Sequence, residues 1–462
     1  MKILVRLFLI LICILNLAWA GEQPDPRTMS FQQLDFSIPQ SKRLLLDNHI
    51  PVYLLPDHEI PLVTLTAMIR TGSVYDPADK SGLAALTGRM LRNGGTKTVL
   101  PDQLDDELEF MASAVESYFG TDSGIVTMSC LSRNLTATLD IFADLLFKPG
   151  FDSKRLQIVR QQMLEDIRRQ NDDPKELADR ELEKLIYAGH PLGSFPTENS
   201  IKAIQRSDLI DFHKKFVKPE NIIIAVSGDV DEKKLLPLLN QLLGRYANND
   251  DQPLPQIPAV QSSFRPQLQF VQKKVNQTVI RFGHLGITKD DPDLYAVRVL
   301  DYILGGSFTS RLMTEVRTNQ GLAYNVGSSF DVGRRFTGSF TAQTETRANA
   351  TIKTIKLMQN IIEDIRQQPV TAQELKLAKD SIINSFLFGF TTPQTVVSQQ
   401  MRLEFYNYQP DFLEKYREKI AAVTAEDVLR AAKRLLHPDA FKLVVVGDES
   451  AFDEPLSTLN QR

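Results

Sequence analysis

The stretch that decides the fold is Asp208–Asp229, DLIDFHKKFVKPENIIIAVSGD, because it recurs in altered form at Asp427–Asp448 as DVLRAAKRLLHPDAFKLVVVGD. An aspartate, a proline, a glycine and a final aspartate stand in register in both copies, at an offset of 219 residues. Each copy has the pattern of an amphipathic helix, a proline-containing turn and a buried strand of β-branched residues that stops at Gly-Asp. The sequence therefore predicts an internal duplication.

A second pair of segments supports the duplication. The segment Leu91–Gly95, LRNGG, resembles Tyr302–Gly306, YILGG, at an offset of 211 residues. We predict two homologous domains over residues 34–246 and 268–450. Residues 247–267 contain four prolines and a run of asparagine and aspartate, which is typical of an interdomain linker.

Inside each half, segments that alternate between apolar and polar residues are interleaved with long helical patterns. Val63–Ile69 and Ile125–Ser129 have the period of strands, whereas Phe151–Arg169 and Ala350–Gln367 have the period of helices. This succession predicts the α+β class, with two sheet-plus-helix domains.

The composition of the chain excludes several classes of protein. The chain has 462 residues, of which 42% are hydrophobic and 24% charged, and this excludes a disordered or collagen-like protein. Residues 1–20 have the pattern of a signal peptide, with an apolar run behind two basic residues, and predict a periplasmic or secreted protein. No later run is apolar enough for a membrane span. The net charge of −4 argues against a nucleic-acid partner.

The segment Ser81–Thr96, SGLAALTGRMLRNGGT, resembles the N-terminal signature of the M16 family of zinc peptidases, in which H-x-x-E-H lies in G-L-A-H-x-x-E-H-M-L-x-x-G-T. The flanking residues match this signature. Ala85, Gly88 and Arg89, however, replace the two histidines and the glutamate.

These replacements remove the chemistry of the motif. Positions i, i+3 and i+4 share one helix face, which lets two imidazoles bind one zinc ion beside a carboxylate. Alanine and glycine side chains have no lone pair, and an arginine is a permanent cation. We therefore predict no metal site and no bound cofactor in this chain. The resemblance implies a third family ligand at Glu165, which otherwise reads as a solvated surface residue. Ala85→His, Gly88→Glu and Arg89→His together should then restore zinc affinity.

The segment Gly305–Ser329, GGSFTSRLMTEVRTNQGLAYNVGSS, resembles the C-terminal half of the same family. The resemblance implies that Arg317 and Tyr324 hold the substrate. From the residues alone, Arg317 falls near a helix end before Gly321, and Tyr324 begins a strand, so both can point off one edge. The alternative is an exposed helix arginine and a half-buried strand tyrosine.

The resemblance extends from about Leu34 to Asp448. It implies a noncatalytic, substrate-binding subunit of a heterodimeric M16 zinc peptidase, in the form of a half clam shell. Its partner would be a homologous subunit with an intact H-x-x-E-H and the zinc ion, and its substrate a peptide. Two alternatives remain open: a non-proteolytic peptide-binding or scaffold protein of the same fold, and a self-sufficient peptidase with an unrecognised site.

Overall fold

Strands of apolar and β-branched residues build one sheet in each half of the computed structural model, which describes residues 36–246, 253–261 and 264–460. The predicted signal peptide, the start of the first predicted domain and part of the predicted linker lie outside these described residues. The strands of the first sheet are β1 (Lys42–Leu45), β2 (Pro51–Pro56), β3 (Leu62–Ile69), β4 (Ala114–Phe119), β5 (Gly124–Leu131) and β6 (Ile222–Gly228). The strands of the second are β7 (Gln267–Gln272), β8 (Thr278–Leu285), β9 (Ala323–Asp331), β10 (Ser339–Thr346) and β11 (Lys442–Gly447).

The two sheets have the same topology apart from the extra edge strand β1. Their orders are β1-β2-β6-β3-β5-β4 and β7-β11-β8-β10-β9. In each, the strand of the repeated motif, β6 or β11, pairs parallel with β2 or β7 and antiparallel with β3 or β8. This equivalence confirms the predicted α+β fold with two homologous sheet-plus-helix halves.

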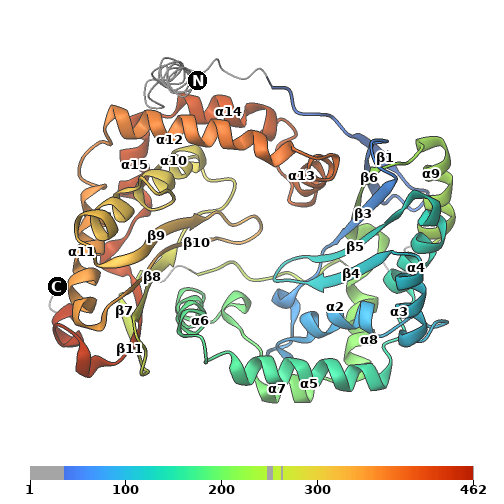
Figure 1. Ribbon diagram of the computed structural model, residues 1–462, viewed down its shortest axis with the longest axis horizontal. Helices are drawn as coiled ribbons and strands as arrows, with labels where there is room; N and C mark the ends of the chain where they lie inside the picture. Colours follow the sequence, from blue (N-terminus) through green and yellow to red (C-terminus); the bar gives the residue numbers. More distant parts are fainter. Residues whose placement is uncertain (1–35, 247–252, 262–263, 461–462) are drawn as a thin grey trace, which may run out of the picture. The chain divides into compact units, whose positions relative to one another are not determined.

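Helices cover one face of each sheet and enclose a core (Figure 1). The first half contributes α2 (Leu83–Asn93), α3 (Pro101–Phe110), α4 (Leu135–Phe147), α5 (Ser153–Arg169), α7 (Glu198–Ala203), α8 (Arg206–Phe216) and α9 (Glu232–Leu239). The second half contributes α10 (Leu294–Leu304), α11 (Thr351–Asp364), α12 (Ala372–Ser385), α14 (Phe412–Ala422) and α15 (Ala425–Leu435). Cys130 is buried in the first core, as its apolar setting predicts.

The conserved spacing of the repeated motif reflects helix capping in both halves. Asp208 accepts a hydrogen bond from the backbone N–H of Gln205 at 2.7 Å, and Asp427 accepts one from the backbone N–H of Thr424 at 3.0 Å. These bonds begin α8 and α15, because each satisfies a backbone donor that the helix leaves unpaired. The first aspartate of each repeat is therefore a helix start signal.

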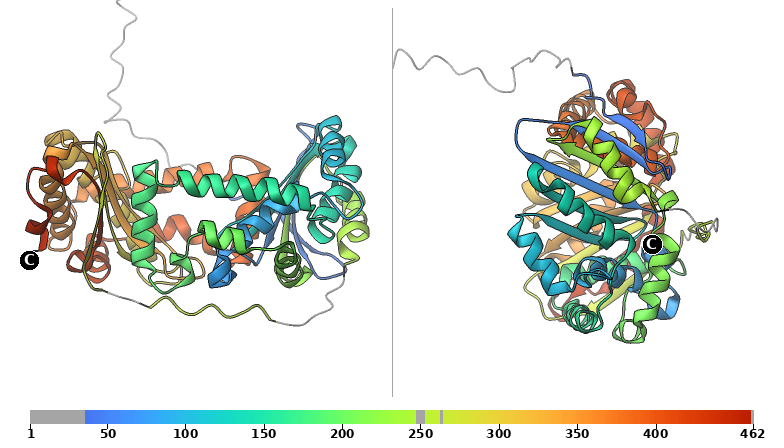
Figure 2. Two further views of the ribbon diagram at one scale, coloured as in Figure 1. Left: turned by 90° about the horizontal axis from the view of Figure 1, so that it is seen from below. Right: turned by 90° about the vertical axis from the view of Figure 1, so that its right-hand side faces the viewer.

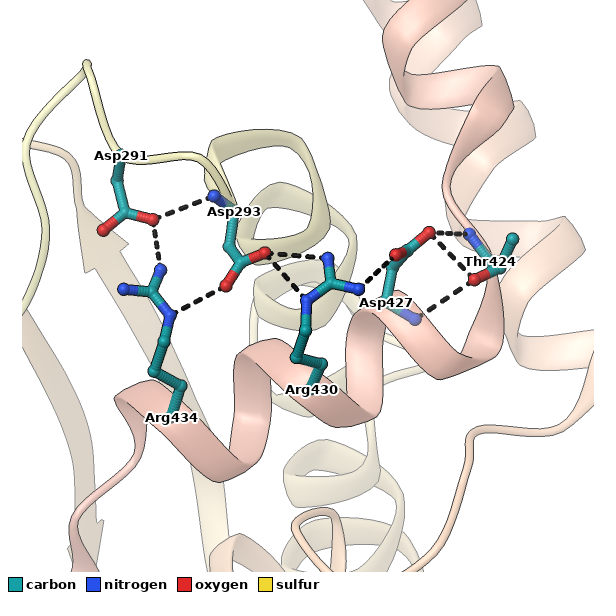
Figure 3. Close-up of polar contacts among 6 residues, drawn as sticks. All are labelled: Asp291, Asp293, Thr424, Asp427, Arg430 and Arg434. Atoms are coloured by element: carbon teal, nitrogen blue, oxygen red, sulfur yellow. Dashed lines mark hydrogen bonds and ion pairs between the residues drawn. The ribbon is translucent and has the colours of Figure 1, made fainter.

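Helix α15 is also fixed to the start of α10 by a charged cluster (Figure 3). Asp293 is buried, and its carboxylate accepts from Arg430 Nη2 and from Arg434 Nε, both at 2.8 Å. Arg434 also pairs with Asp291, and Arg430 pairs with Asp427 at 2.6 Å. The cap of α15 and its packing against α10 are thus parts of one network.

The two halves exchange a helix across the duplication. Helix α6 (Pro174–Ile186), from the first half, packs on the second sheet, and α13 (Pro393–Phe405), from the second half, packs on the first sheet. The helices have equal length and stand 219 residues apart. Their buried residues also correspond at this offset: Leu177, Ala178, Leu182 and Ile186 in α6, and Val396, Val397, Met401 and Phe405 in α13. The exchange buries the otherwise exposed face of each sheet.

A tyrosine at the end of each exchanged helix fastens it to a hairpin of the other half. The Tyr187 hydroxyl donates to the Thr337 carbonyl in the β9–β10 loop, and the Tyr406 hydroxyl donates to Asp122 in the β4–β5 loop, both at 3.1 Å. Buried Arg281 on β8 also binds Asp179 of α6 at 2.5 Å. The sequence ranges of the two predicted domains each contain one sheet, but packing crosses between them.

Residues 253–261 of the proline-rich stretch contain no helix or strand and run along one side of the molecule in Figure 2, whereas Gln267, at the end of the predicted linker, already begins β7. The carbonyl of Pro258 lies 2.9 Å from His190 Nε2, and Val260 packs against the α6 cluster. Among the described residues, every helix is too short or too polar to pass through a lipid bilayer.

Candidate functional site

Helix α2 carries the altered zinc motif and is held at its first turn by Asp76. The Asp76 carboxylate accepts from the backbone N–H groups of Gly82 at 2.7 Å and Ala84 at 2.8 Å. Burial raises the pKa of the Asp76 carboxyl to about 7, although these backbone donors oppose the shift. Gly82 precedes the helix with a φ of 100°, a left-handed conformation that suits glycine. The motif helix is therefore well anchored despite its loss of metal ligands.

Gly88 lies where α2 and β4 approach most closely. A Cβ atom at this position would lie 2.5 Å from the backbone nitrogen of Phe119 and 3.0 Å from its Cβ. The Ser117 hydroxyl donates to the Gly88 carbonyl at 2.5 Å, which holds the strand against the helix. Any side chain at position 88 would push the two elements apart. The variant Ala85→His/Gly88→Glu/Arg89→His is therefore expected to disturb the packing of α2 against β4, which corrects the prediction that it restores zinc affinity.

The other two motif positions also lack a metal site. Ala85 is half-buried, and the Arg89 guanidinium pairs with Asp166 of α5 at 3.3 Å. Glu165, the predicted remnant of the third ligand, pairs with Arg168 at 3.3 Å and Arg169 at 3.6 Å along its own helix. Glu165 is thus engaged like a solvated surface residue.

The residues present do not fit the zinc ion that the motif would imply. Within residues 36–246, 253–261 and 264–460, no three His, Cys, Asp or Glu side chains come together in a group that could hold a metal ion. At the motif itself, methyl, hydrogen and guanidinium groups stand where lone pairs are required. Helix α2 therefore offers no ligand set for a zinc ion.

Arg317 and Tyr324 come together at the end of the second sheet. Arg317 lies in the π-helical segment Met313–Asn319, and Gly321 then reverses the chain with a φ of 58°. Tyr324 follows at the start of edge strand β9. The Arg317 Cζ lies 5.0 Å from the centre of the Tyr324 ring, so the guanidinium and the ring are stacked.

The pair is open to a ligand. Tyr324 is 80% exposed, although an aromatic strand residue is more often partly covered. In the part of the chain that the structure describes, no hydrogen bond reaches the Tyr324 hydroxyl and no carboxylate pairs with Arg317; the guanidinium Nη1 contacts only the Met313 sulfur, at 3.9 Å. Both groups can donate hydrogen bonds to one carbonyl oxygen.

A pocket of about 250 Å³ adjoins this pair through Met313 and Asn325. Its wall is formed by Gly305 and Gly306, and its rim carries Phe308, which is 80% exposed. The Ser328 hydroxyl at the base is buried and has no hydrogen-bond partner among the described residues. The pocket was not predicted from the sequence. Its signal was the Gly-Gly turn at the start of the segment Gly305–Ser329, because residues without side chains allow the close approach that forms the pocket wall.

The helix exchange was also missed by sequence reasoning. Its signal was present, because the 219-residue offset that aligns Asp208 with Asp427 also aligns Pro174 with Pro393 and Tyr187 with Tyr406. Each proline occupies the first turn of its helix, where its missing N–H has no cost.

Two family models match this chain, and they divide it at a different point from the two sheets. Residues 52–197 match the family model described as Insulinase (Peptidase family M16), and residues 203–382 match the model described as Peptidase M16 inactive domain. The boundary near residue 200 precedes α8 and β6, which complete the first sheet.

Relatives include a Bacillus subtilis (strain 168) protein named uncharacterized zinc protease YmxG, 22% identical over 401 residues, which are 86% of this chain and 96% of that protein. A Helicobacter pylori (strain ATCC 700392 / 26695) protein named non-peptidase homolog YmxG is 26% identical over 341 residues, or 73% and 77% of the two chains. The crystal structure of a peptidase M16 inactive domain from Pseudomonas fluorescens superposes with a TM-score of 0.80 at 27% identity, covering 88% of this chain and 98% of that chain.

Proposed function

Since the chain belongs to the M16 peptidase family but lacks the zinc-binding residues, we propose that it is a noncatalytic, substrate-binding subunit of a heterodimeric M16 zinc peptidase. The partner in this proposal is a homologous subunit that carries an intact H-x-x-E-H motif and its zinc ion. That ion supplies the activated water for peptide hydrolysis. This chain supplies side chains that bind and orient the peptide.

The observation that carries the proposal is the open Arg317–Tyr324 pair. The stack of guanidinium on ring, at 5.0 Å, limits the freedom of both side chains before a substrate arrives. Arginine offers a rigid fork of N–H donors to peptide carbonyls, and the tyrosine hydroxyl donates to a carbonyl oxygen as it gains negative charge. Prealigned donors of this kind need little reorganisation during the reaction.

The pocket beside the pair supports a peptide as the ligand, because its lining combines polar and apolar groups. Asn325 and Ser307 provide donors and acceptors that match main-chain amides, and exposed Phe308 provides an apolar contact. Edge strand β9, which carries Tyr324, pairs with β10 alone among the described strands. Its other edge is covered further along the strand, where the Phe330 N–H donates to Asp301 at 3.0 Å, but the part next to Tyr324 can present backbone N–H and C=O groups to an extended peptide.

We further propose a periplasmic or secreted location, which rests on the leader-like residues 1–20 alone. The encounter with the partner would then occur after export. An interface specific enough for such a pair should bury more than roughly 1,000 Å².

The test is coexpression of this chain with an H-x-x-E-H-bearing M16 chain of the same organism, followed by purification through a tag on one of them. Peptidase activity is then measured for each chain alone and for the mixture. The proposal expects copurification at equal stoichiometry and cleavage by the mixture at a rate well above that of either chain. Two independent species in light scattering at micromolar concentration, with no gain in cleavage on mixing, would overturn it.

A further inference from the structure

A second pocket lies in the first half, between the end of α4, the start of α5 and helix α8. It has a volume of about 490 Å³, within the range of small-molecule sites, and we call it the basic pocket. We propose that the basic pocket binds a small amphipathic anion, with one carboxylate, sulfonate or phosphate head and an apolar or aromatic body.

The floor of the basic pocket is apolar and partly rigid. Phe147 and Tyr246 stack with their ring centres 4.1 Å apart, and Phe151 packs edge-on against His213 at 5.8 Å. Ile210 from α8 completes the apolar surface. Stacked aromatic rings in a concave site favour a flat or branched apolar body over water.

The rim of the basic pocket is cationic. Lys97, Arg206, Lys214 and Lys218 line it, and its lining contains no aspartate or glutamate. Arg206 is held in place because its Nε donates to the Phe151 carbonyl at 2.7 Å and its Nη2 to the Gly150 carbonyl at 2.8 Å. Neither Lys97 nor Lys214 forms an ion pair with another described residue. The chain carries a net charge of −4, so its bulk composition does not account for this rim.

His213 responds to the unbalanced charge of the rim. Its Nε2 lies 2.8 Å from the Leu146 carbonyl oxygen and donates to it. Burial is the main cause that lowers the His213 pKa to about 4, and the positive charges of Lys97 and Lys214 lower it further. The imidazole is therefore neutral at pH 7, and the charge that faces the pocket belongs to the lysines and Arg206.

The duplication supplies an internal control for this feature. At the offset of 219 residues, Arg206 and His213 correspond to Ala425 and Ala432, and only Lys214 has a basic counterpart, Lys433. The apolar framework is retained, since Ile210 corresponds to Leu429. The repeated helix, turn and strand therefore form without a cation at the position of Arg206, which leaves this guanidinium available to a ligand.

The experiment compares two fluorescent probes that differ only by a sulfonate group, the anionic 8-anilinonaphthalene-1-sulfonate and the neutral N-phenyl-1-naphthylamine. Titrations use the wild-type chain, the double variant Lys97→Gln/Lys214→Gln and the matched control Lys433→Gln. The double variant should weaken binding of the sulfonate at least tenfold and leave binding of the neutral probe within about twofold, because only the sulfonate loses charge-assisted contacts. The control should bind both probes like the wild type.

Competition with 2-naphthoate and 2-naphthyl phosphate distinguishes the two natural head groups, and displacement of the sulfonate by either one supports the proposal. The apolar floor is tested separately by Ile210→Asp, which should weaken both probes. The proposal is overturned if the double variant retains wild-type affinity for the sulfonate, if it weakens both probes equally, or if neither naphthyl anion displaces the bound probe.

Discussion

Helix α2 in the first half and the turn from Arg317 to Tyr324 in the second half differ in the room that they leave for a ligand. On α2, Gly88 lies against the backbone of β4, and Arg89 is paired with Asp166. At the turn, by contrast, Tyr324 is 80% exposed and stacked on Arg317. The loss of the zinc ligands thus coincides with close packing of the motif helix, while the side chains suited to a peptide remain accessible. This difference favours a chain that binds substrate without cleaving it.

The largest effect is expected from Gly88→Glu, which would break the close packing of α2. A Cβ at this position meets the Phe119 backbone nitrogen at 2.5 Å, and the carboxylate would enter a buried site. Overpacking and burial of a charge together should lower the free energy of unfolding by roughly 3 kcal/mol or more. Urea unfolding followed by circular dichroism measures this loss.

The matched control is Ala85→Glu, one turn earlier on a half-buried part of the same helix, which should cost less than about 1 kcal/mol. A Gly88→Glu protein as stable as the wild type would show that α2 and β4 leave room for a side chain at position 88. Zinc affinity that depends on Glu165 in the variant Ala85→His/Gly88→Glu/Arg89→His would show the same.

Arg317→Ala removes the fork of donors from the open site. In the mixture with the H-x-x-E-H-bearing partner, we expect kcat/KM for peptide cleavage to fall about 10²-fold, with a substantial share in KM if the guanidinium binds the peptide backbone in the ground state. Stability of the chain should change little, since Arg317 makes no ion pair with another described residue. Arg317→Lys keeps the charge but not the fork, and an equal loss in both variants assigns the effect to the fork.

One buried histidine with a lowered pKa lies in each half, so acid should affect both halves and provides a test that does not depend on either candidate site. Burial lowers the pKa of His284 in the second half to about 4 from an ordinary 6.5, and the His213 pKa in the first half falls to a similar value. Between pH 6.5 and 4 each of these two histidines therefore binds more protons in the unfolded chain than in the folded chain, so its own contribution to stability falls as the pH falls through this window, by at most roughly 3 kcal/mol. Burial raises the pKa values of Asp76 and Asp301 to about 7 and about 6, which acts in the opposite direction over the same window, so each histidine is tested by comparing its variant with the wild type.

The neutral form of His284 is required by its hydrogen bonds, because Nδ1 donates to the Leu285 carbonyl at 2.8 Å and Nε2 accepts from the His437 backbone N–H at 3.2 Å. Urea unfolding at pH 7.0 and 4.5 checks the effect. His284→Asn should lower stability at pH 7, and the difference in stability between this variant and the wild type should become smaller at pH 4.5, because the wild type then loses the contribution of the neutral imidazole. An unchanged pH dependence in this variant would contradict the assignment.

The smallest effect is expected from Arg89→Ala. Arg89 and Asp166 are both substantially exposed, and pairs of this kind contribute about 0.5 kcal/mol or less. Neither the melting temperature nor cleavage by the mixture should change measurably. A clear loss of cleavage would mean that the altered motif has a role in substrate binding, and would remove the contrast between the two sites.

The repeats in the sequence were sufficient to predict the duplication and the α+β class. The short segment between Arg317 and Tyr324 was sufficient to predict that these two residues lie close together. These features depend on local patterns: the caps at Asp208 and Asp427, and a single turn between Arg317 and Tyr324. The prediction that α2 holds no zinc ion rests on residue chemistry alone, because Ala85, Gly88 and Arg89 offer no lone pair, and it stays a prediction until the metal content is measured.

Two features depended on tertiary packing and were not predicted. The exchange of α6 and α13 is decided by which sheet face each helix covers, and amphipathicity alone does not specify a partner. The close packing at Gly88 depends on β4, whose Phe119 lies 31 positions further along the chain. A glycine inside a helix signals close approach only when the opposing backbone is known.

The central claim is that this chain donates hydrogen bonds to a substrate held at its partner's zinc, and Tyr324→Phe tests it most directly. The substitution removes one hydroxyl and leaves the ring on Arg317, and exposed Tyr118→Phe in the first half serves as the matched control. Partner affinity by calorimetry and cleavage by the mixture are measured together. We predict unchanged affinity and melting temperature with a turnover at least tenfold lower, since loss of one such donor typically costs about 10² to 10³. A Tyr324→Phe chain that binds the partner and supports cleavage at the wild-type rate would contradict the account.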